Sequence, residues 1–533
     1  MLTEIQKPAL QPAPTLYIDG NNLQLEDVER VAHAESIVKL SEGAVTQLNA
    51  SRKVVERLVE SGEAIYGVTT GFGKFKDVHI SGKDSEKLQR NLLLSHAAGT
   101  GPCFDAPAVR AIMLLRANAL AKGYSGIRTE VVQLLLDCLN AGVHPCVPEQ
   151  GSLGASGDLA PLAHLALVLI GEGEADYAGT RHPGVEALRA AGLAPVSLVA
   201  KEGLALTNGT QLMGALGSLI IVEAERLAKV ADIIGAMSLE AQLGSVRAFN
   251  ERIHEIRPHP GQLKSAANLR RLLADSSIMA SHANCPMVQD AYSLRCMPQV
   301  HGASRQAFRH AREVFEIEVN SATDNPLVFE EHVLYGGNFH GQPLAIVLDY
   351  LAIALSELAN IAERRIERLV NPALSNGLPA FLTKYGGLNS GYMIAQYTAA
   401  SLVSENKSLA HPASVDSIPT SANQEDHVSM GAIAARKARA ILHNLRKVLA
   451  IELLCAAQGL DFRISEVTRC NVGGNHAQAS PGPGVVAAHK LVREHITFLE
   501  EDRPLYIDMQ TAERLITSGD LLRTVEHAIG ALA

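Results

Sequence analysis

Long runs of apolar residues with alternating spacings of three and four positions dominate this chain. Residues 342–372 contain the clearest run, and its apolar positions are Leu344, Leu348, Leu351, Leu355, Leu358, Ala362 and Leu369. Such spacing places side chains on one face of an α-helix, and Pro372 ends the run. Residues 210–242 and 431–458 show the same pattern. Helices this long and this apolar need several neighbours, so we predict a helix bundle shared between subunits.

The N-terminal part of the chain combines shorter helices with irregular segments. Residues 15–28 predict a short β-hairpin, because alternating apolar residues flank Gly20-Asn21-Asn22. Helical patterns follow to about residue 145, interrupted by a glycine-rich loop at 66–73. A second irregular zone reaches about Gly209. The segment TDNPLVFEEHVLYGGNFHG predicts another small hairpin followed by a loop.

These patterns together predict a mainly α protein. We expect a core bundle of long helices, a smaller and loop-rich N-terminal active-site domain, and minor β hairpins. The expected divisions are a flexible tail at 1–15, the N-terminal domain at 16–209, and the long-helix bundle with a C-terminal helical region at 210–533.

Composition narrows the functional classes. Apolar residues make up 47% and charged residues 19% of the chain, as in globular proteins. The net charge of −9 predicts no binding to nucleic acid or to an anionic membrane surface. The first residues lack the apolar core of a signal peptide, and no uninterrupted apolar run has the length of a membrane span. We therefore expect a cytoplasmic protein.

The cysteines support the same location. Seven are present, an odd number, and no two form a CxxC pair. This usage predicts free thiols in a reducing compartment rather than a framework of disulfides.

One glycine-rich segment, GSLGASGDLAPLAH at residues 151–164, precedes an apolar helix. Its glycines follow the pattern GxxGxxG, which differs from the GxGxxG of dinucleotide sites, and GK[ST] of phosphate-binding loops is absent. The segment YGVTTGFG fails the same tests. We therefore expect no nucleotide cofactor.

The tripeptide Ala155-Ser156-Gly157 allows a different chemistry. If the amide nitrogen of Gly157 attacks the carbonyl carbon of Ala155, a five-membered ring closes. Loss of two waters, one of which carries the Ser156 hydroxyl, leaves an electrophilic exocyclic methylidene. Small flanking residues permit the close backbone approach that this needs. The tripeptide alone is equally compatible with a small turn that caps a helix.

Seven further segments accompany the tripeptide in a fixed order: YGVTTGFG, NLLLSHAAGTG, LTNGTQ, QDAYSLRC, TDNPL, GNFHG and TSANQEDHVSMG. With GSLGASGDLAPLAH they resemble the motifs of the aromatic amino-acid ammonia-lyases, between about Tyr66 and Met430. The resemblance implies a methylidene-imidazolone prosthetic group (MIO) formed from Ala155, Ser156 and Gly157. It also implies a homotetramer with active sites shared between chains.

Within this family, the chain is most similar to the histidine ammonia-lyases. Glu425 stands where phenylalanine and tyrosine lyases typically carry Gln, and Ser95-His96 stands where they carry an aromatic residue or His followed by Leu. The resemblance implies elimination of ammonia from L-histidine to give trans-urocanate. Departures from the family pattern lie beside the site, at Ala291 and at 297–301. A tyrosine or phenylalanine lyase, an aminomutase, and a structural protein without turnover are the alternatives.

The resemblance also assigns residues to the reaction. Tyr66 matches the base that removes the β-proton, with a role as a loop anchor as the alternative. Asn208 and Tyr292 match residues that contact or polarise the MIO ring and the amine. Arg295 suits the substrate carboxylate because its planar guanidinium can bind both oxygens. Gln289 precedes Arg295 by six positions, so one helical or turn segment can present it together with Tyr292 and Arg295.

The remaining assignments concern the imidazole ring of the substrate. His96 and Glu425 match its binding residues, and a carboxylate accepts a hydrogen bond from a ring N–H more strongly than an amide does. His96 also fits a satisfied core histidine. Phe339 matches a residue that lines the pocket. No HExxH motif or zinc-type spacing of His and Cys occurs, so we expect no metal.

Overall fold

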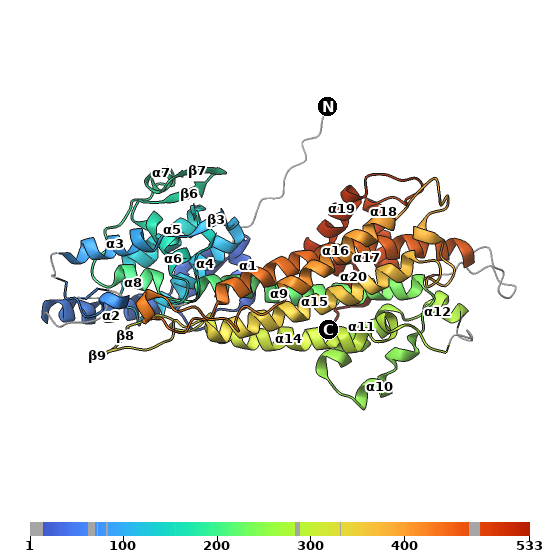
Figure 1. Ribbon diagram of the computed structural model, residues 1–533, viewed down its shortest axis with the longest axis horizontal. Helices are drawn as coiled ribbons and strands as arrows, with labels where there is room; N and C mark the ends of the chain where they lie inside the picture. Colours follow the sequence, from blue (N-terminus) through green and yellow to red (C-terminus); the bar gives the residue numbers. More distant parts are fainter. Residues whose placement is uncertain are drawn as a thin grey trace. The chain divides into compact units, whose positions relative to one another are not determined.

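The structure, a computed structural model, describes residues 14–61, 70–71, 73–80, 84–154, 156–282, 288–330, 332–467 and 480–533. Within these ranges the chain forms twenty α-helices, and its sheets contain two or three short strands each (Figure 1). The prediction of a mainly α fold is confirmed.

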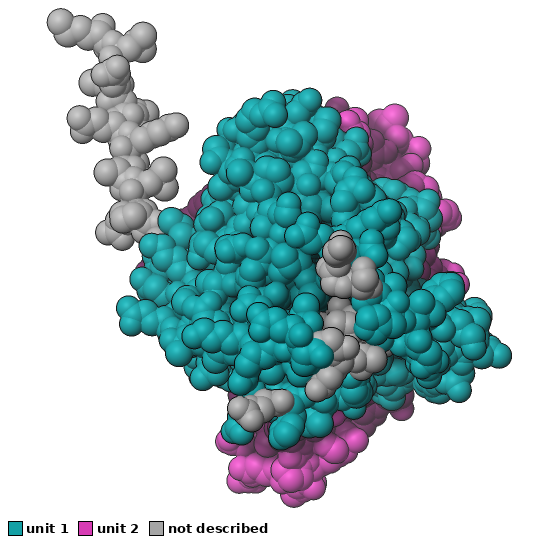
Figure 2. All heavy atoms as spheres, turned by 90° about the vertical axis from the view of Figure 1, so that its left-hand side faces the viewer, with its two compact units in different colours: residues 1–219, 312–346, 413–436 teal, residues 220–311, 347–412, 437–533 magenta. Residues whose placement is uncertain are grey.

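The chain folds into two units, each built from three separate segments. Unit 1 consists of Met1–Leu219, Arg312–Ile346 and Ala413–Arg436, and Figure 2 shows it in teal. Unit 2 consists of Ile220–Ala311, Val347–Pro412 and Lys437–Ala533 and is magenta in the same view.

Residues 15–28 do not form the expected hairpin. Strand β1 (Thr15–Ile18) pairs in parallel with β2 (Ile37–Leu40), and helix α1 (Leu25–Ala32) connects them. Parallel strands require such a crossover, whereas a hairpin joins antiparallel strands. Leu25, Val28 and Val31 are buried at a helical spacing of three residues. The apparent alternation was therefore the end of a strand followed by the first turn of a helix.

The helices expected before residue 145 are present. They are α2 (Glu42–Ser61), α3 (Ser85–His96), α4 (Ala106–Ala121) and α5 (Thr129–Ala141). The side chain of Asp105 caps α4 by accepting a hydrogen bond from the amide of Ala108. Gly142, at φ +78°, ends α5 in the left-handed conformation that glycine adopts readily.

A disulfide in unit 1 contradicts the prediction of free thiols. Strand β3 (Thr100–Cys103) pairs antiparallel with β5 (Pro148–Gln150), which brings Cys103 close to Cys146. The two form a disulfide with Cα atoms 5.7 Å apart. Because 43 positions separate them, their proximity follows only from the strand pairing. Cys138, Cys296 and Cys455 are free, and Cys285 and Cys470 lie outside the described residues.

The irregular zone around residues 146–209 contains further elements. Its helices are α6 (Leu159–Leu169), α7 (Gly184–Ala190) and α8 (Glu202–Thr207), and strands β4 (His144–Pro145), β6 (Glu174–Tyr177) and β7 (Thr180–Pro183) form one sheet. The second predicted hairpin is confirmed, because β8 (Leu327–Phe329) pairs antiparallel with β9 (His332–Leu334).

Three long helices carry the predicted apolar repeats, namely α9 (Gln211–Ala241), α15 (Gln342–Val370) and α17 (Gly431–Val467), and α14 (Met297–Glu318) is a fourth long helix. The division between the two units falls inside each of them. All seven apolar positions predicted for α15 are fully buried. The predicted helices at 210–242 and 431–458 are confirmed, and the latter continues to Val467.

Among the described residues, α15 is the one helix long and apolar enough to cross a membrane, and 72% of its most apolar window is buried within the protein. That burial is typical of a core helix. The remaining helices of unit 2 are α10 (Glu251–Glu255), α11 (Pro260–Leu272), α12 (Ser277–Ser281), α13 (Tyr292–Arg295), α16 (Met393–Leu409), α18 (Pro483–His495), α19 (Leu505–Thr517) and α20 (Asp520–Ile529).

Candidate active site

The glycine-rich loop before α6 packs against the turn that follows α8. Gly157 has φ +72°, and a Cβ atom there would lie 2.1 Å from the carbonyl oxygen of Gly209. The amide of Asp158 donates a hydrogen bond of 2.6 Å to the same oxygen. No residue with a side chain fits at position 157, so the glycine secures the close contact between the two turns.

Ser156, beside Gly157, directs its hydroxyl to a carboxylate. Its Oγ donates to Oε1 of Glu425 over 3.2 Å, and the Thr420 hydroxyl donates to Oε2 over 3.1 Å. Thr420 and Glu425 also exchange two backbone hydrogen bonds across a tight loop. Within this loop Ser421 and Ala422 both have φ +52°, which side-chain-bearing residues rarely adopt. Such strained conformations persist where the surrounding structure holds them, and they cluster at functional sites.

His96 ends α3 and lies on the wall of the same cavity as Glu425. Burial lowers the pKa of His96, and a hydrogen bond with the Leu92 backbone and the Glu425 charge oppose that shift. The Ser95 hydroxyl, which lies 3.0 Å from Nδ1 of His96, donates to the Leu92 carbonyl over 3.1 Å. Since that carbonyl can only accept, the arrangement favours a proton on Nδ1 and leaves Nε2 as an acceptor.

Asn208 follows α8 and is 2% exposed. Its side-chain nitrogen donates to the carbonyl of Asn325 over 2.9 Å and to Oδ1 of Asp324 over 3.3 Å. Its backbone carbonyl accepts from Arg116 over 2.9 Å. The side chain is therefore held from behind by the segment 324–325.

A buried carboxylate lies under the loop. Asp158 accepts hydrogen bonds from the Ser152 hydroxyl and from the backbone amide of Met213. Burial raises the pKa of Asp158 to about 7, although these hydrogen bonds favour the ionised form. The protonated form of Asp158 is therefore favoured more strongly than that of an exposed aspartate.

Two adjoining cavities open at Ser156. The larger has a volume of about 790 Å³ and is mostly apolar, with Ser95, His96, Asn208 and Leu92 among its lining residues. The other, of about 770 Å³, is lined by more polar groups, including His340 and His427. They share Gly73, Ser156, Asn325, Phe339 and Glu425, so Phe339 lies on the wall of both cavities. All of these lining residues belong to unit 1.

The predicted residues Gln289, Tyr292 and Arg295 belong to unit 2. Tyr292 and Arg295 begin and end the short helix α13, and Gln289 lies just before it. The Arg295 guanidinium lies 4.6 Å from the centre of the Tyr292 ring, within the range of a cation–π contact. Tyr292 is 71% exposed, and Gln289 is also exposed. The structure thus presents the three side chains on one short segment.

Tyr66 and Ala155 lie outside the described residues. Conversely, the structure adds residues that sequence reasoning did not single out, namely Thr420, Asn325 and Asp324. Each belongs to a segment already quoted for its resemblance, TDNPL or TSANQEDHVSMG. The motifs therefore included these residues, but the sequence alone did not indicate which hydrogen bonds each of them forms.

The chain around Ser156 fits an internal ring on two observations. The contact between Gly157 and Gly209 leaves no room for a side chain, as a ring involving the Gly157 nitrogen requires. The Ser156 hydroxyl, which such a ring loses, faces the cavity that holds Glu425. In the described ranges, no three His, Cys, Asp or Glu side chains are grouped so that they can hold a metal ion.

Comparisons with known proteins agree with the sequence motifs. A family profile described as "Aromatic amino acid lyase" matches residues 23–494. A histidine ammonia-lyase of Alkaliphilus oremlandii is 56% identical over 516 residues, which are 96% of this chain and 99% of that protein.

Two solved structures are similar to this chain over nearly its whole length. The histidine ammonia-lyase of Trypanosoma cruzi is similar with a TM-score of 0.87 and 43% identity, over 97% of this chain and 96% of the other. The tyrosine aminomutase of Streptomyces globisporus has a TM-score of 0.90 and 39% identity, over 97% of this chain and 100% of the other.

Proposed function

The chain belongs to the aromatic amino acid lyase family, and from this premise we propose that it is a histidine ammonia-lyase. It eliminates ammonia from L-histidine and releases trans-urocanate. The bonds from Cα to nitrogen and from Cβ to hydrogen break, and a carbon–carbon double bond forms. The observation that carries the choice of substrate is the cavity in which His96 and Glu425 lie together with Ser156.

We propose that Ala155, Ser156 and Gly157 form the MIO ring that the family resemblance implies. When formed, this group supplies an electrophile for the substrate amine, since ammonia is otherwise a poor leaving group. The backbone contact between Gly157 and Gly209 holds the loop in place. Asn208 lies in the same cavity wall and contributes a polar group there.

His96 and Glu425 read the imidazole of the substrate in this proposal. The Glu425 carboxylate accepts a hydrogen bond from a ring N–H, which phenylalanine and tyrosine rings lack. His96 offers Nε2 to the cavity, and Leu92, Phe339 and Leu204 supply apolar walls for the ring carbons. A ring with both polar and apolar edges suits this mixed lining.

Removal of the β-proton and binding of the substrate carboxylate require residues other than those on that cavity wall. We assign removal of the β-proton to Tyr66 and binding of the carboxylate to Arg295, with Gln289 and Tyr292 beside it. In the homotetramer that the resemblance implies, three chains contribute to each pocket. Exposure of Tyr292 and Gln289 on a single chain supports such a contribution.

A cytoplasmic location remains part of the proposal. The disulfide between Cys103 and Cys146 is a feature that reducing compartments rarely preserve. Labelling of free thiols in protein isolated from cells under acid quench tests the point. Labelling of neither Cys103 nor Cys146 indicates that the disulfide is present in the cell, and labelling of both that it is reduced there.

A tyrosine-directed lyase or aminomutase is the second candidate, because the aminomutase of S. globisporus shares the fold. Glu425 argues against it, since a tyrosine ring leaves that carboxylate without an N–H partner.

The test is turnover of purified protein with L-histidine, L-tyrosine and L-phenylalanine in parallel, followed by the absorbance of the conjugated product. We expect rapid urocanate formation and at least about a hundredfold lower kcat/KM for the other two substrates. Preference for tyrosine, or formation of a β-amino acid, contradicts the proposal.

A further inference from the structure

A buried ion pair lies behind Asn208. Nζ of Lys201 donates to Oδ2 of Asp324 over 2.6 Å, and the two side chains are 0% and 1% exposed. The carboxylate therefore has one oxygen on the lysine, while the other accepts from the side chain of Asn208 and from the amide of Asn325. Lys201 and Asn208 are thus connected through a single carboxylate.

This connection determines which way the carboxamide of Asn208 faces. Its nitrogen donates to Asp324 and to the carbonyl of Asn325. Both N–H bonds are thereby used, on acceptors that cannot donate in return. Oδ1 of Asn208 is buried, and no group in the described part of the chain donates to it. Asn208 is among the residues that line the cavity, and its one polar atom without a partner among the described residues is this acceptor.

Lys201 is itself held in a conformation that its residue type rarely adopts. Its φ is +76°, in the left-handed region. On one side of it, the Ala200 carbonyl accepts from Arg52 over 3.0 Å. On the other side, the Glu202 carboxylate is bound by Arg128 through Nε at 2.8 Å and Nη2 at 2.7 Å.

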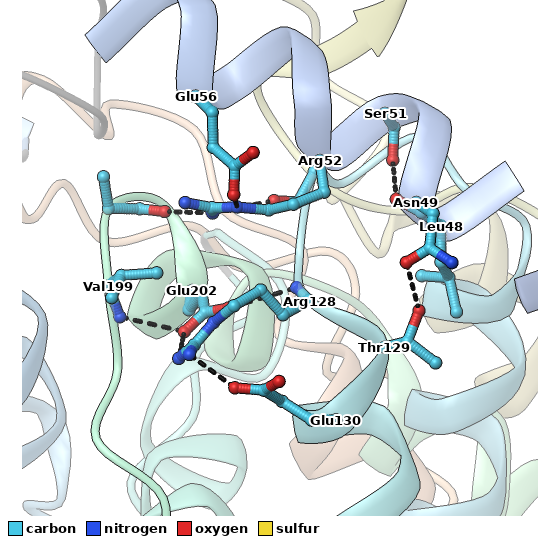
Figure 3. Close-up of polar contacts among 12 residues, drawn as sticks. Leu48, Asn49, Ser51, Arg52, Glu56, Arg128, Thr129, Glu130, Val199 and Glu202 are labelled. Atoms are coloured by element: carbon cyan, nitrogen blue, oxygen red, sulfur yellow. Dashed lines mark hydrogen bonds and ion pairs between the residues drawn. The ribbon is translucent and has the colours of Figure 1, made fainter. Parts of the chain in front are cut away.

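Figure 3 shows these two arginines, with Arg128 beside Glu202 and Val199. Glu202 also accepts from the amide of Val199 over 2.9 Å, which closes the turn. These contacts of the neighbouring residues hold Lys201 in its left-handed conformation. In this conformation its ammonium group contacts Asp324 in the interior. Burial lowers the pKa of Lys201, and the charge of Asp324 opposes that shift.

We propose that Lys201 is a positioning residue of the active site, which through Asp324 fixes Asn208 with its oxygen toward the ligand. The group that Asn208 binds is then a hydrogen-bond donor. In an amino acid substrate, the α-ammonium group is the donor nearest to the bond that breaks. This inference rests on the proposed function, because it assigns a recognition role within the same site.

A neutral residue at position 201 reverses this arrangement. Without the ammonium, the buried carboxylate of Asp324 loses its paired cation and favours its protonated form. A protonated Asp324 donates a hydrogen bond and competes with the Asn208 N–H groups. A protonated Asp324 favours the opposite orientation of the carboxamide, against the remaining bond from its nitrogen to the Asn325 carbonyl. Where the carboxamide turns, it meets the ligand ammonium with a donor.

The test compares two inhibitors that share the imidazole ring. Histamine has the amine and lacks the carboxylate, whereas imidazolepropionate has the carboxylate and lacks the amine. In Lys201→Met we expect the inhibition constant for histamine to rise at least about tenfold, the effect of one hydrogen bond to a charged group. For imidazolepropionate we expect a change of less than about threefold, because Asn208 does not touch it in this scheme.

Arg110→Met is the matched control. Arg110 is another buried cation of unit 1, 5% exposed, and it binds the carbonyls of Val31 and Leu139. Its loss lowers stability in the same way and leaves both inhibition constants within about twofold of wild type. The MIO absorbance band of each variant is recorded alongside, so that a failure of maturation is seen directly.

Two further variants keep the test decisive if Lys201→Met folds poorly. Lys201→Gln retains a shorter neutral donor, and it is expected to raise the histamine constant by a smaller factor. In Lys201→Met with Asp324→Asn, the new amide oxygen can again accept from Asn208. The histamine constant should return to within about threefold of wild type.

The outcomes separate this inference from the proposed function. If the wild type does not convert L-histidine, the proposed function fails. If it does, and Lys201→Met weakens both inhibitors equally or neither of them, Lys201 supports only the fold and the positioning role is wrong.

Discussion

Asp158 and Asp232 are both fully buried carboxylates, yet their surroundings have opposite effects. Asp158, in unit 1, accepts hydrogen bonds from neutral groups, and burial raises its pKa to about 7. At Asp232, in unit 2, burial acts in the same direction. There Arg305 and His301 outweigh it and lower the pKa to about 2, helped by Ser265.

The two carboxylates differ in whether a cation contacts them. Arg365 and Glu452 of unit 2, both 0% exposed, form a second buried ion pair through a bidentate contact. Within the described residues Asp158 has only neutral hydrogen-bond partners, and Glu240 of unit 2 is comparable, since burial raises its pKa to about 7. A buried carboxylate without a cation is costly, and Asp158 lies directly under the glycine-rich loop of the site.

The largest effect is expected at the cavity of unit 1, for Ser156→Ala. We expect activity to fall at least about 10⁴-fold, as when a group that acts in covalent catalysis is removed. The thermal midpoint should change little, because one hydroxyl at the cavity surface is lost. The near-ultraviolet MIO band should disappear, and mass spectrometry of the wild-type peptide should show two waters missing. Active protein with a hydrated tripeptide contradicts the assignment.

The next largest effect concerns the paired ions of unit 2. Arg365→Met leaves Glu452 buried and uncompensated, so we expect about 3–5 kcal/mol of lost unfolding free energy in urea titrations. Combining it with Glu452→Leu should recover most of this loss, since a well-packed apolar pair avoids the desolvation of two charges. A double variant as unstable as the single one shows that Glu452 has a structural role beyond this pair, for instance through Ser238.

A smaller effect is expected for Glu425→Gln. The volume is nearly unchanged, while the charged acceptor for the imidazole N–H is lost. We expect kcat/KM for histidine to fall about ten- to a hundredfold, or 1.5–3 kcal/mol. Relative rates for tyrosine and phenylalanine should rise. Measurement of all three substrates decides the matter, and unchanged histidine preference shows that Glu425 does not read the ring.

The most gradual effects are the slopes of stability against pH, because each is spread over several pH units. In the folded protein the pKa of Asp158 lies above its ordinary value of 3.8. The contribution of this group to the free energy of unfolding is therefore complete below pH 3.8 and is lost as the pH rises to about 7. The pKa of Asp232 lies below its ordinary value. Its contribution to the free energy of unfolding is therefore complete above pH 3.8 and is lost as the pH falls to about 2.

Replacing each aspartate by Asn removes the corresponding slope, of at most about 1.4 kcal/mol per pH unit. Unfolding free energies between pH 2 and 8 measure both. Equal slopes in the two variants contradict the contrast between Asp158 and Asp232.

Much of the helical architecture was predictable because it depends on local periodicity. Every apolar position assigned to α15 is buried, and Pro372 follows its end. The hairpin expected at 15–28 was wrong because β1 pairs with a strand beyond α1. The disulfide between Cys103 and Cys146 was missed for the same reason, since strand pairing brings the two together.

The site shows the same limit. Ser156, His96, Asn208, Phe339 and Glu425 were named from motifs, and they line one cavity. Their catalytic roles remain predictions. Lys201 and Asp324 were not singled out, because a salt bridge across 123 positions leaves no periodic signal in the sequence. Motifs therefore identified which residues meet, and hydrogen bonds were needed to say how each is oriented.

The contact between Gly157 and Gly209 also restricts how this protein can change, in nature or in the laboratory. A methyl group at position 157 would strike the Gly209 carbonyl at 2.1 Å, and one at 209 would lie 2.3 Å from Gln211 and 2.5 Å from Arg116. Most clashes can be relieved by trimming the partner residue. At position 157 the partner is the backbone of another glycine, so no second substitution compensates, whereas at position 209 the partners are side chains. Libraries that seek new substrates should therefore vary the cavity wall and leave Gly157 untouched.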